Sequence, residues 1–320
     1  MTSTPSQGRL GIGLDIGGTS TRAGVVDADG TVIALVTIPS GRGADGVVAT
    51  ARAAVQAVGR LAGVGLHEVD VVGVGIPGTV DPGRGSVHHA VNLGIGRDVV
   101  DLGARLGAEL GAPVHVENDV RAAALGADWY VANEGRGVDD LAYLSIGTGI
   151  AAGYVERGRV RRGSRFVAGE IGHIPIDPRG PNCACGQVGC LEAIASGAAI
   201  ERLWPTTHGS PAVALQQAAV AGDPAAGLIW DAVIVGLGRA VVMLALTWDP
   251  DIVVISGGVA TLGQALHDAI AQQLAQDGQR GAFLRSLDLG ARLRVIEPSV
   301  PLGPIGAVRA ARAAYVAPLP

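Results

Sequence analysis

Short segments rich in Val and Ile alternate with longer Ala- and Leu-rich segments of helical spacing along the whole sequence. Such alternation is typical of α/β proteins, in which helices connect the strands of a mostly parallel sheet. With 320 residues, the chain is long enough for one large domain or two medium ones. We predict buried strands at residues 10–15, 69–75, 114–117, 141–146 and 251–256, and helices at 46–61, 98–110, 120–131, 194–203, 211–221, 224–247, 262–276 and 305–315.

The alternation also contains a weak internal repeat. Residues 14–30 and residues 144–158 both read as a strand, a Gly-rich turn, a second strand with an inner Gly, and a tight turn. One interpretation is a duplicated α/β unit whose two Gly-rich turns face each other across a cleft. The other is that two β-hairpins in a chain with 50 Gly look alike by chance.

The basic residues restrict the chemistry, because all 24 are Arg and the sequence contains no Lys. A Walker A loop and an ordinary protein-kinase fold both need a Lys at the phosphates, so both are excluded. Schiff-base chemistry through a lysine amine is excluded for the same reason. A phosphate ligand would therefore have to be bound by backbone N–H groups, hydroxyls, Arg or metal ions.

Charge and hydropathy favour a cytoplasmic protein. The formal net charge is −5, which argues against nucleic acid or an anionic membrane as a partner. The longest apolar stretch, residues 232–248, is interrupted by Arg239 and is predicted to be too short to cross a bilayer. The N-terminal residues lack the basic and apolar regions of a signal peptide.

Three Gly-rich turns at strand ends are candidate nucleotide contacts. Glycines let backbone N–H groups approach a phosphate, a neighbouring hydroxyl adds a donor, and a strand-end carboxylate such as Asp15 could hold Mg²⁺ through water. Each turn alone could equally be an ordinary connection between two elements. The three turns are Asp15-Ile-Gly17-Gly18-Thr19, Gly147-Thr148-Gly149 and Ser256-Gly257-Gly258.

The run Glu117-Asn118-Asp119 directly follows a predicted strand and precedes an Ala-rich helix. Asn and Asp are common helix N-caps, so capping alone could explain both residues. Two adjacent caps are redundant, however, and strand-end residues of α/β sheets tend to face the ligand crevice. A carboxylate at this position could act as a general base toward a hydroxyl, with Asn118 holding a neighbouring hydroxyl.

The most specific local signal is His173 followed by Cys183, Cys185 and Cys190. Three thiolates and one imidazole are the ligands of a closed, structural zinc site. Such a zinc knuckle would hold Glu170 and Glu192 rigidly beside the imidazole, where carboxylates are good partners for sugar hydroxyls. The alternatives are free structural cysteines and two solvated loop carboxylates.

Taken together, these motifs resemble the ROK family (repressor, open reading frame, kinase), and most closely its bacterial glucokinases. The resemblance extends from Gly11 to the last predicted helix. It rests on Asp15-Ile-Gly-Gly-Thr19, Gly75-Ile-Pro-Gly78, Glu117-Asn-Asp119, Gly147-Thr-Gly149, Glu170-Ile-Gly-His173, the run from Cys183 to Glu192, and Ser256-Gly-Gly258.

The resemblance implies an actin-like, hexokinase-like fold of two RNase H-like α/β domains that close on ATP and a hexose. The smaller domain would comprise residues 1–117 plus 303–320, and the larger domain, residues 118–302, would carry the zinc site. Asp119 would be the catalytic base, and a homodimer or homotetramer would be the assembly. The implied cofactors are ATP, Mg²⁺ and structural Zn²⁺. The implied sugar contacts are Gly78, Asn118, Asp119, Glu170, His173 and Glu192; the nucleotide contacts are Asp15, Gly17, Gly18, Thr19, Gly147, Thr148, Gly149, Gly257 and Gly258; the zinc ligands are His173, Cys183, Cys185 and Cys190.

Two features bear on the substrate and on the competing classes. Family glucokinases often have a Trp where this chain has Ile95, so mannose, fructose or an N-acetylhexosamine stays open beside glucose. ROK repressors carry a helix-turn-helix module before the first phosphate turn, whereas only 14 residues precede Asp15 here. A sugar-binding protein without catalysis is a third possibility, which the intact Asp119 and phosphate turns disfavour.

Overall fold

The computed structural model describes residues 10–316, which form two compact units. The first unit contains the chain up to residue 137, residues 158–167 and the chain from residue 301. The second contains residues 138–157 and 168–300. The N-terminal residues 1–9, on which the predicted absence of a signal peptide and a DNA-binding module partly rests, lie outside the described residues, as do residues 317–320 of the predicted smaller domain.

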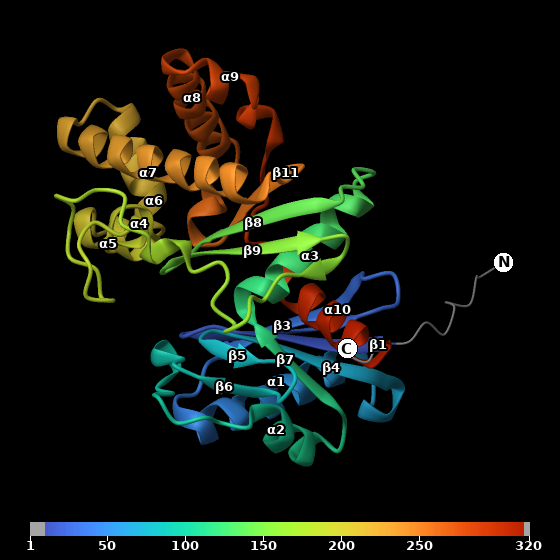
Figure 1. The fold of residues 1–320 in the computed structure, drawn as a ribbon. Coiled ribbons are helices and arrows are strands. Elements are labelled where there is room, and N and C mark those ends of the chain that lie inside the picture. The colour runs from blue at the N-terminus through green and yellow to red at the C-terminus, as the bar shows by residue number, and fades with distance from the viewer. Residues whose placement is uncertain (1–9, 317–320) are drawn as a thin grey trace. The chain divides into compact units, whose positions relative to one another are not determined.

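The first unit is built on a five-stranded sheet in the order β3-β2-β1-β4-β7 (Figure 1). β1, β2 and β3 are antiparallel neighbours, whereas β1, β4 and β7 run parallel to one another. A small hairpin, β5 with β6, follows β4. The strands are β1 (Leu10–Ile16), β2 (Ser20–Val26), β3 (Val32–Pro39), β4 (Val69–Ile76), β5 (Thr79–Asp81), β6 (Ser86–His88) and β7 (Val114–Asn118).

Two pairs of helices cover the two faces of this sheet (Figure 1). α1 and α2 bury their apolar stripes on one face, where Ile12 and Leu14 of β1 lie in the same core. α3 and α10 cover the other face and pack against each other. The helices are α1 (Gly43–Ala62), α2 (Leu102–Leu110), α3 (Asp119–Asn133) and α10 (Leu302–Val316).

Glycines allow α10 to lie unusually close to the sheet and to α3. A Cβ on Gly13 of β1 would lie 1.9 Å from the carbonyl oxygen of Pro304, and one on Gly73 of β4 would lie 2.0 Å from that of Ala307. A Cβ on Gly306 of α10 would lie 1.6 Å from the Ala122 oxygen of α3. Any larger residue at these positions would collide with backbone, so the glycines set the spacing of these layers.

The second unit repeats the same sheet arrangement, in the order β10-β9-β8-β11-β12. β8 pairs antiparallel with β9 and parallel with β11, and β11 pairs parallel with β12. The internal repeat in the sequence therefore corresponds to a structural repeat, β1-β2 in one unit and β8-β9 in the other. The strands are β8 (Asp140–Ile146), β9 (Ile150–Glu156), β10 (Arg159–Val160), β11 (Ile252–Ser256) and β12 (Leu293–Val295).

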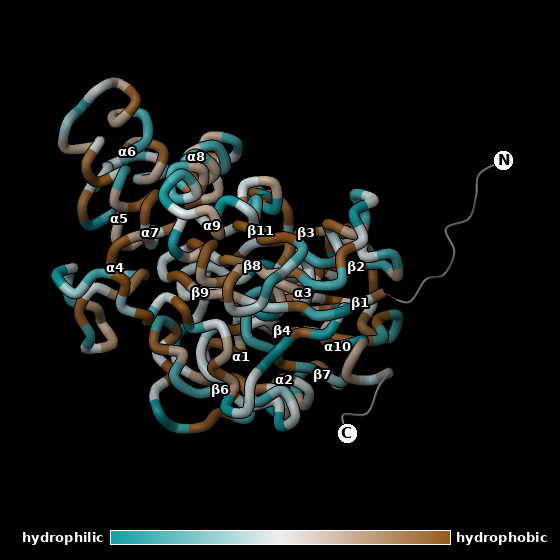
Figure 2. Tube along the Cα trace, turned by 45° about the horizontal axis from the view of Figure 1, so that its top comes forward, coloured by the Kyte–Doolittle hydropathy of each residue, from teal (hydrophilic) through white to brown (hydrophobic). Residues whose placement is uncertain are grey.

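Helices α4 to α8 contribute to one large core in the second unit. α8 buries a stripe at Leu266, Ile270 and Leu274, and its other residues give it the hydrophilic turns visible in Figure 2. The helices are α4 (Leu191–Ala195), α5 (Gly197–Leu203), α6 (Pro211–Val220), α7 (Pro224–Trp248), α8 (Gln264–Arg280) and α9 (Ala282–Ser286); the 3₁₀ helices of both units are η1 (Leu66–Glu68), η2 (Val91–Leu93), η3 (Ile171–His173), η4 (Gly258–Leu262) and η5 (Leu289–Arg292).

Helix α7 is longer than the apolar stretch in the sequence suggests. Its 25 residues make it long and apolar enough to cross a membrane by length and composition, so the expectation that this segment is too short is wrong. Half of its most apolar 18-residue stretch is buried, however, and Val233, Leu237 and Leu244 belong to the core of the second unit. A core helix of a globular unit passes the same test, so the length carries little weight.

Two parts of the fold differ in extent from their predicted limits. The first compact unit extends past residue 117, where the smaller domain was predicted to end, because α3 packs against α10. The predicted helix at 194–203 is two short helices separated at Ser196, whose side chain accepts a hydrogen bond from the Ala199 N–H and caps α5.

Candidate functional site

The predicted site residues lie in two sets, one in each unit. In the first unit, Asp15 is at the end of β1, and Gly17 and Gly18 form the turn into β2, with the Gly17 N–H donating to the Ser20 oxygen (2.9 Å). A Cβ on Gly18 would lie 2.9 Å from the Cβ of Asn92, so this turn lies against the segment after β6. Thr19 is exposed at the turn.

The Asp15 carboxylate lies at the beginning of α10. A Cβ on Gly303 would come within 2.6 Å of its carboxyl group, so only glycine fits beside it. Burial raises the pKa of Asp15, and the charge of Arg22 partly opposes that shift. A carboxylate whose charge is disfavoured in this way would gain from a bound cation.

Asn118 and Asp119 lie where β7 ends and α3 begins. Asn118 is the N-cap of α3: its Oδ1 accepts from the N–H groups of Val120 (3.1 Å) and Arg121 (3.2 Å). Its Nδ2 donates to the Gly78 oxygen (3.3 Å), so the structure brings these two predicted sugar contacts together. Asp119 is half-buried in the first turn, and its Oδ1 accepts from the Val120 N–H (2.9 Å).

Gly78 is held in the left-handed region, with φ of 99°. A Cβ there would lie 2.7 Å from the His88 oxygen and 2.9 Å from the Ala90 nitrogen, both backbone atoms. The position therefore requires glycine for its conformation and for its close packing.

In the second unit, the other two Gly-rich turns lie together at the carboxyl ends of the parallel strands β8 and β11. The Gly197 N–H donates to the Gly147 oxygen (2.8 Å) and the Ala198 N–H to the Thr148 oxygen (3.3 Å), which fixes the turn against the start of α5. Gly257, with φ of 102°, packs where a Cβ would lie 2.6 Å from the Ile146 oxygen. Gly258 begins η4, so a 3₁₀ helix separates this turn from α8.

Glu192 joins the Gly147–Gly149 turn to the segment that holds His173. Its Oε2 accepts from the Ile150 N–H (2.9 Å), and a Cβ on Gly149 would lie 2.2 Å from the same oxygen. A Cβ on Gly172 would lie 3.3 Å from the Glu192 Cβ. Glu170 is exposed directly before η3, and its backbone oxygen accepts from the His173 N–H (3.2 Å).

The four predicted zinc ligands gather into one cluster. The His173 Nδ1 lies 3.8 Å from the Cys183 Sγ, and the Sγ atoms of Cys185 and Cys190 are 3.7 Å apart. The ligand atoms of His173, Cys183 and Cys185 all lie within 4.8 Å of one another. Zn–S bonds of about 2.3 Å in a tetrahedron place two sulfurs about 3.8 Å apart, so the donor set fits zinc.

A fifth residue of this cluster, Gln187, was not predicted from the sequence. The Gln187 amide donates to the His173 oxygen (2.9 Å) and to the Cys185 Sγ (3.4 Å). It therefore supports the thiol from outside, as residues around metal ligands commonly do. Its position between two of the cysteines was the only signal in the sequence.

Ile95, where related glucokinases often have Trp, is buried in the core of the first unit with 3% of its surface exposed. It follows Gly94, which has φ of 73° and ends η2. The side chain thus packs with the apolar residues behind the loop and does not itself present a polar group to a ligand.

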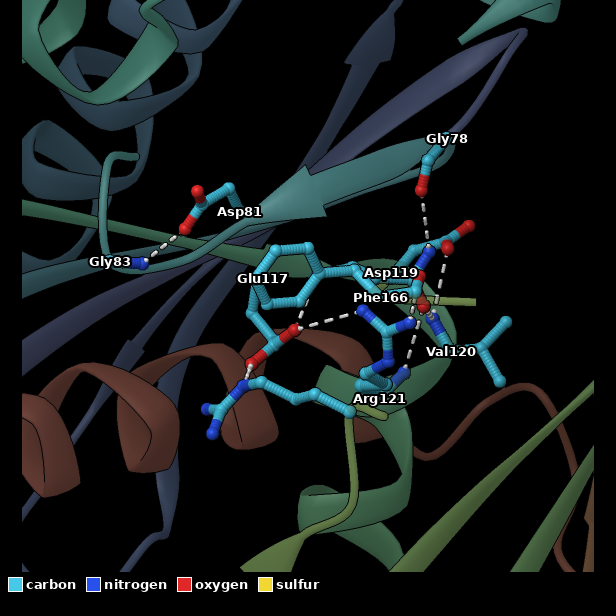
Figure 3. Close-up of polar contacts among 10 residues, drawn as sticks. Gly78, Asp81, Gly83, Glu117, Asp119, Val120, Arg121 and Phe166 are labelled. Atoms are coloured by element: carbon cyan, nitrogen blue, oxygen red, sulfur yellow. Dashed lines mark hydrogen bonds and ion pairs between the residues drawn. The ribbon is translucent and has the colours of Figure 1, made fainter. Parts of the chain in front are cut away.

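Sequence reasoning also missed a buried charge cluster behind Asp119 (Figure 3). Glu117 is fully buried, and its carboxylate lies 2.7 Å from the Arg162 Nε and 3.6 Å from the Arg121 Nη1. Arg162 belongs to a segment in which Arg157, Arg159, Arg161, Arg162 and Arg165 follow in close succession. No local pattern could pair Arg162 with Glu117, because 45 residues separate them.

Comparison with known proteins agrees with the fold. The ROK family model matches residues 11–285, and the chain belongs to the ROK family. It is similar to a glucokinase of Thermotoga maritima, with 35% identity over 284 residues that cover 82% of this chain and 86% of the relative. It is also 30% identical to an N-acetylmannosamine kinase of Yersinia pseudotuberculosis, over 84% of this chain and 89% of that protein.

A solved structure has a similar fold. The ROK family glucokinase from Streptomyces griseus, crystallised in complex with glucose and AMPPNP, has a TM-score of 0.76 and 31% sequence identity to this chain. The match covers 95% of this chain and 99% of the other. The match therefore includes residues of both units.

Proposed function

We propose that this protein is an ATP-dependent sugar kinase that phosphorylates the 6-hydroxyl of a hexose, with glucose as the first candidate. The observation that carries the proposal is the placement of the Asp119 carboxylate at the first turn of α3, beside Asn118 and Gly78. The glucokinases of Thermotoga maritima and Streptomyces griseus, the latter bound to glucose and AMPPNP, support glucose and ATP as the substrates.

The proposed reaction is an in-line phosphoryl transfer. Asp119 accepts the proton of the sugar 6-hydroxyl while that oxygen bonds to the γ-phosphorus and the bond to the bridging oxygen of ADP breaks. Backbone N–H groups of the Gly17–Gly18, Gly147–Gly149 and Gly257–Gly258 turns would bind the phosphates and the nucleoside. The N–H groups of Gly17 and Gly147 are excepted, because they donate within their own turns to the Ser20 and Gly149 oxygens. Asp15 would hold Mg²⁺, which neutralises phosphate charge when bound with ATP.

Six residues are proposed to contact the sugar. In the first unit, Gly78, Asn118 and Asp119 are the proposed contacts, and in the second, Glu170, His173 and Glu192. Because His173 directs Nδ1 toward Cys183, its Nε2 lies on the opposite side of the ring. That nitrogen is the one that would meet a sugar hydroxyl.

A structural zinc ion is part of the proposed function. His173, Cys183, Cys185 and Cys190 would hold it, and the separations of their ligand atoms fit that ion. It would supply rigidity and no chemistry. Its effect would be to fix Glu170 directly before η3, His173 within η3, and Glu192 at the start of α4.

An N-acetylhexosamine is the second candidate acceptor, because the N-acetylmannosamine kinase of Yersinia pseudotuberculosis also covers most of the chain. Ile95 in place of Trp leaves mannose and fructose open as well. A cytoplasmic location and a homodimer or homotetramer complete the proposal, in line with the family resemblance.

A coupled assay of ADP release against a panel of hexoses and N-acetylhexosamines tests the proposal. We expect ADP release with glucose, and we expect Asp119→Asn to lower kcat by about 10²-fold, the scale of general-base loss, while sugar binding stays measurable. Asp223→Asn is the matched control, because Asp223 caps α7 through the Ala225 and Ala226 N–H groups and lies outside the proposed site.

No ADP release above background with any sugar would favour a sugar-binding protein without catalysis. Turnover near that of the wild type in Asp119→Asn would remove Asp119 from the role of base.

A further inference from the structure

The carboxylate of Glu117 is an unusual group to find at the end of a strand, because none of its surface is exposed. A buried carboxylate is costly unless charged and hydrogen-bonding partners surround it. A buried ion pair, moreover, adds little net stability compared with apolar packing of the same volume. We therefore ask which neighbouring groups this buried carboxylate holds in place.

Glu117 connects three separate parts of the first unit (Figure 3). Its Oε1 accepts from the Asn118 N–H (2.9 Å) at the end of β7 and lies 3.6 Å from the Arg121 Nη1 of α3. Its Oε2 accepts from the Nε of Arg162 (2.7 Å), in the segment 158–167. His115, two residues earlier on the same side of β7, is also buried, and burial lowers its pKa.

A second contact ties the same segment to α3. The Arg121 Nη2 donates to the backbone oxygen of Phe166 (Figure 3). Phe166 has φ of 57°, a conformation that bulky residues rarely adopt and that needs support from its surroundings. The two arginine contacts supply that support at both ends of a short stretch of chain.

The position of these contacts links them to the proposed chemistry. Asn118 and Asp119 follow Glu117 directly, and Glu170 and His173 come shortly after Phe166 in the sequence. Of the arginines in this segment, Arg162 turns inward and is 28% exposed at its side chain, whereas Arg159, Arg161 and Arg165 are exposed.

We propose that Glu117 and Arg162 are positioning residues of the phosphoryl-transfer site, an inference that rests on the proposed kinase function. The pair fixes the backbone at 117–119 and the segment 158–167, and thereby holds the Asp119 carboxylate at the sugar hydroxyl. Neither residue touches substrate. Small displacements of a catalytic group lower the rate of the chemical step much more than they weaken binding.

Steady-state kinetics of Arg162→Met, Glu117→Gln and the double variant test this inference, with hexose and ATP varied in turn. We expect kcat to fall about 10-fold or more in each single variant while both KM values change less than about threefold. The double variant should be little slower than either single variant, because both remove the same contact. Arg161→Met, which removes an exposed neighbouring charge, should keep kcat within about twofold of the wild type.

Chemical rescue separates positioning from a general loss of structure. Because the Arg162 side chain is partly exposed, guanidinium ion should enter the gap in Arg162→Ala and restore part of kcat, in a saturable way that sodium chloride does not reproduce. Glu117→Gln combined with Arg162→Ala should not respond. If Arg162→Met does not fold, Glu117→Gln, which keeps an acceptor for the Asn118 N–H, carries the same test.

An unchanged kcat in Arg162→Met and Glu117→Gln, a loss confined to KM, or additive losses in the double variant would overturn the inference while leaving the kinase function intact. A folded wild-type protein that transfers phosphate to no hexose would instead overturn the proposed function, and the inference with it.

Discussion

Asn118 serves the local chain and the candidate site with different atoms of one amide. Its oxygen caps α3, and one amide hydrogen goes to the Gly78 oxygen. A side-chain amide has two hydrogens, so the second is the one that would meet a sugar oxygen. Capping and sugar binding, which look like alternatives in the sequence, are therefore compatible at this position.

At Asp15 the surroundings disfavour the charged form of the side chain, because the carboxyl group is buried. Burial raises its pKa above the usual value of an aspartate carboxyl group. A raised folded-state pKa means that the group contributes stability at low pH and loses it as the pH rises through that pKa. We therefore expect Asp15→Asn to melt at a higher temperature than the wild type near pH 7 to 8, while turnover falls.

Thermal unfolding of the wild type and of Asp15→Asn across the pH range measures this difference in stability. The difference in Tm should grow from low to neutral pH, by about 2–4 °C for each 1 kcal/mol. The exposed Asp98 provides the control, since Asp98→Asn should show no such growth. A variant that melts below the wild type at neutral pH would contradict the assignment.

At the scale of elements, small residues decide how closely α10 and α3 approach. Gly126 of α3 faces the Leu302 oxygen, where a Cβ would lie at 2.0 Å, and Gly306 of α10 faces the Ala122 oxygen. The sequence shows these glycines only as interruptions of helical segments, which they weaken by propensity alone. Their value appears when two helices pack at backbone contact.

We expect Gly306→Ala to destabilise the protein by about 1–3 kcal/mol, because the added methyl group must displace backbone. Gly227→Ala is the control, since nothing lies within 4 Å of a Cβ there, and should be neutral or stabilising by about 0.5–1 kcal/mol. Urea unfolding of both variants gives the comparison. Equal stability of the two would show that the helices can separate at little cost.

The cysteine cluster is the other element whose role can be tested directly. We expect the purified protein to contain about one zinc ion per chain, and its removal to increase hydrogen exchange in residues 170–192 and to abolish sugar affinity. His173→Ala should reproduce the loss, whereas His208→Ala, at an exposed loop, should not. Full activity of metal-free protein with reduced, unmodified thiols would refute the zinc assignment.

For the whole molecule, much of the fold could be predicted from the sequence, including the repeat of one sheet order in both units. The strands and helices were predicted because apolar residues recur at the spacing that each element needs. The resemblance of the two Gly-rich hairpins predicted the repeat that the sheets show. The helix at 224–247 was predicted to within one residue of α7, whereas the break at Ser196 could not be predicted in the same way, because a side-chain cap decides where α5 begins.

In the candidate site, too, only the local motifs could be predicted from the sequence. The turns, the Asn118–Asp119 pair and the cysteines could be found because each set is local in the chain. The contact of Glu192 with the Gly149 turn spans about 40 residues, and that of Glu117 with Arg162 a similar distance. No periodicity within one segment encodes such a pairing.

The sequence by itself determined the α/β class, the Gly-rich turns that we propose for phosphate in a chain without Lys, and the His and Cys residues that we propose as zinc ligands. These depend on residue type and local spacing, which the chain carries directly. Only the tertiary structure decided which unit α3 belongs to, that Asp15 lies against Gly303 at the start of α10, and that Arg162 reaches Glu117. Those facts depend on contacts between segments that are far apart in the sequence. Such contacts are decided by the complete fold and not by any one segment.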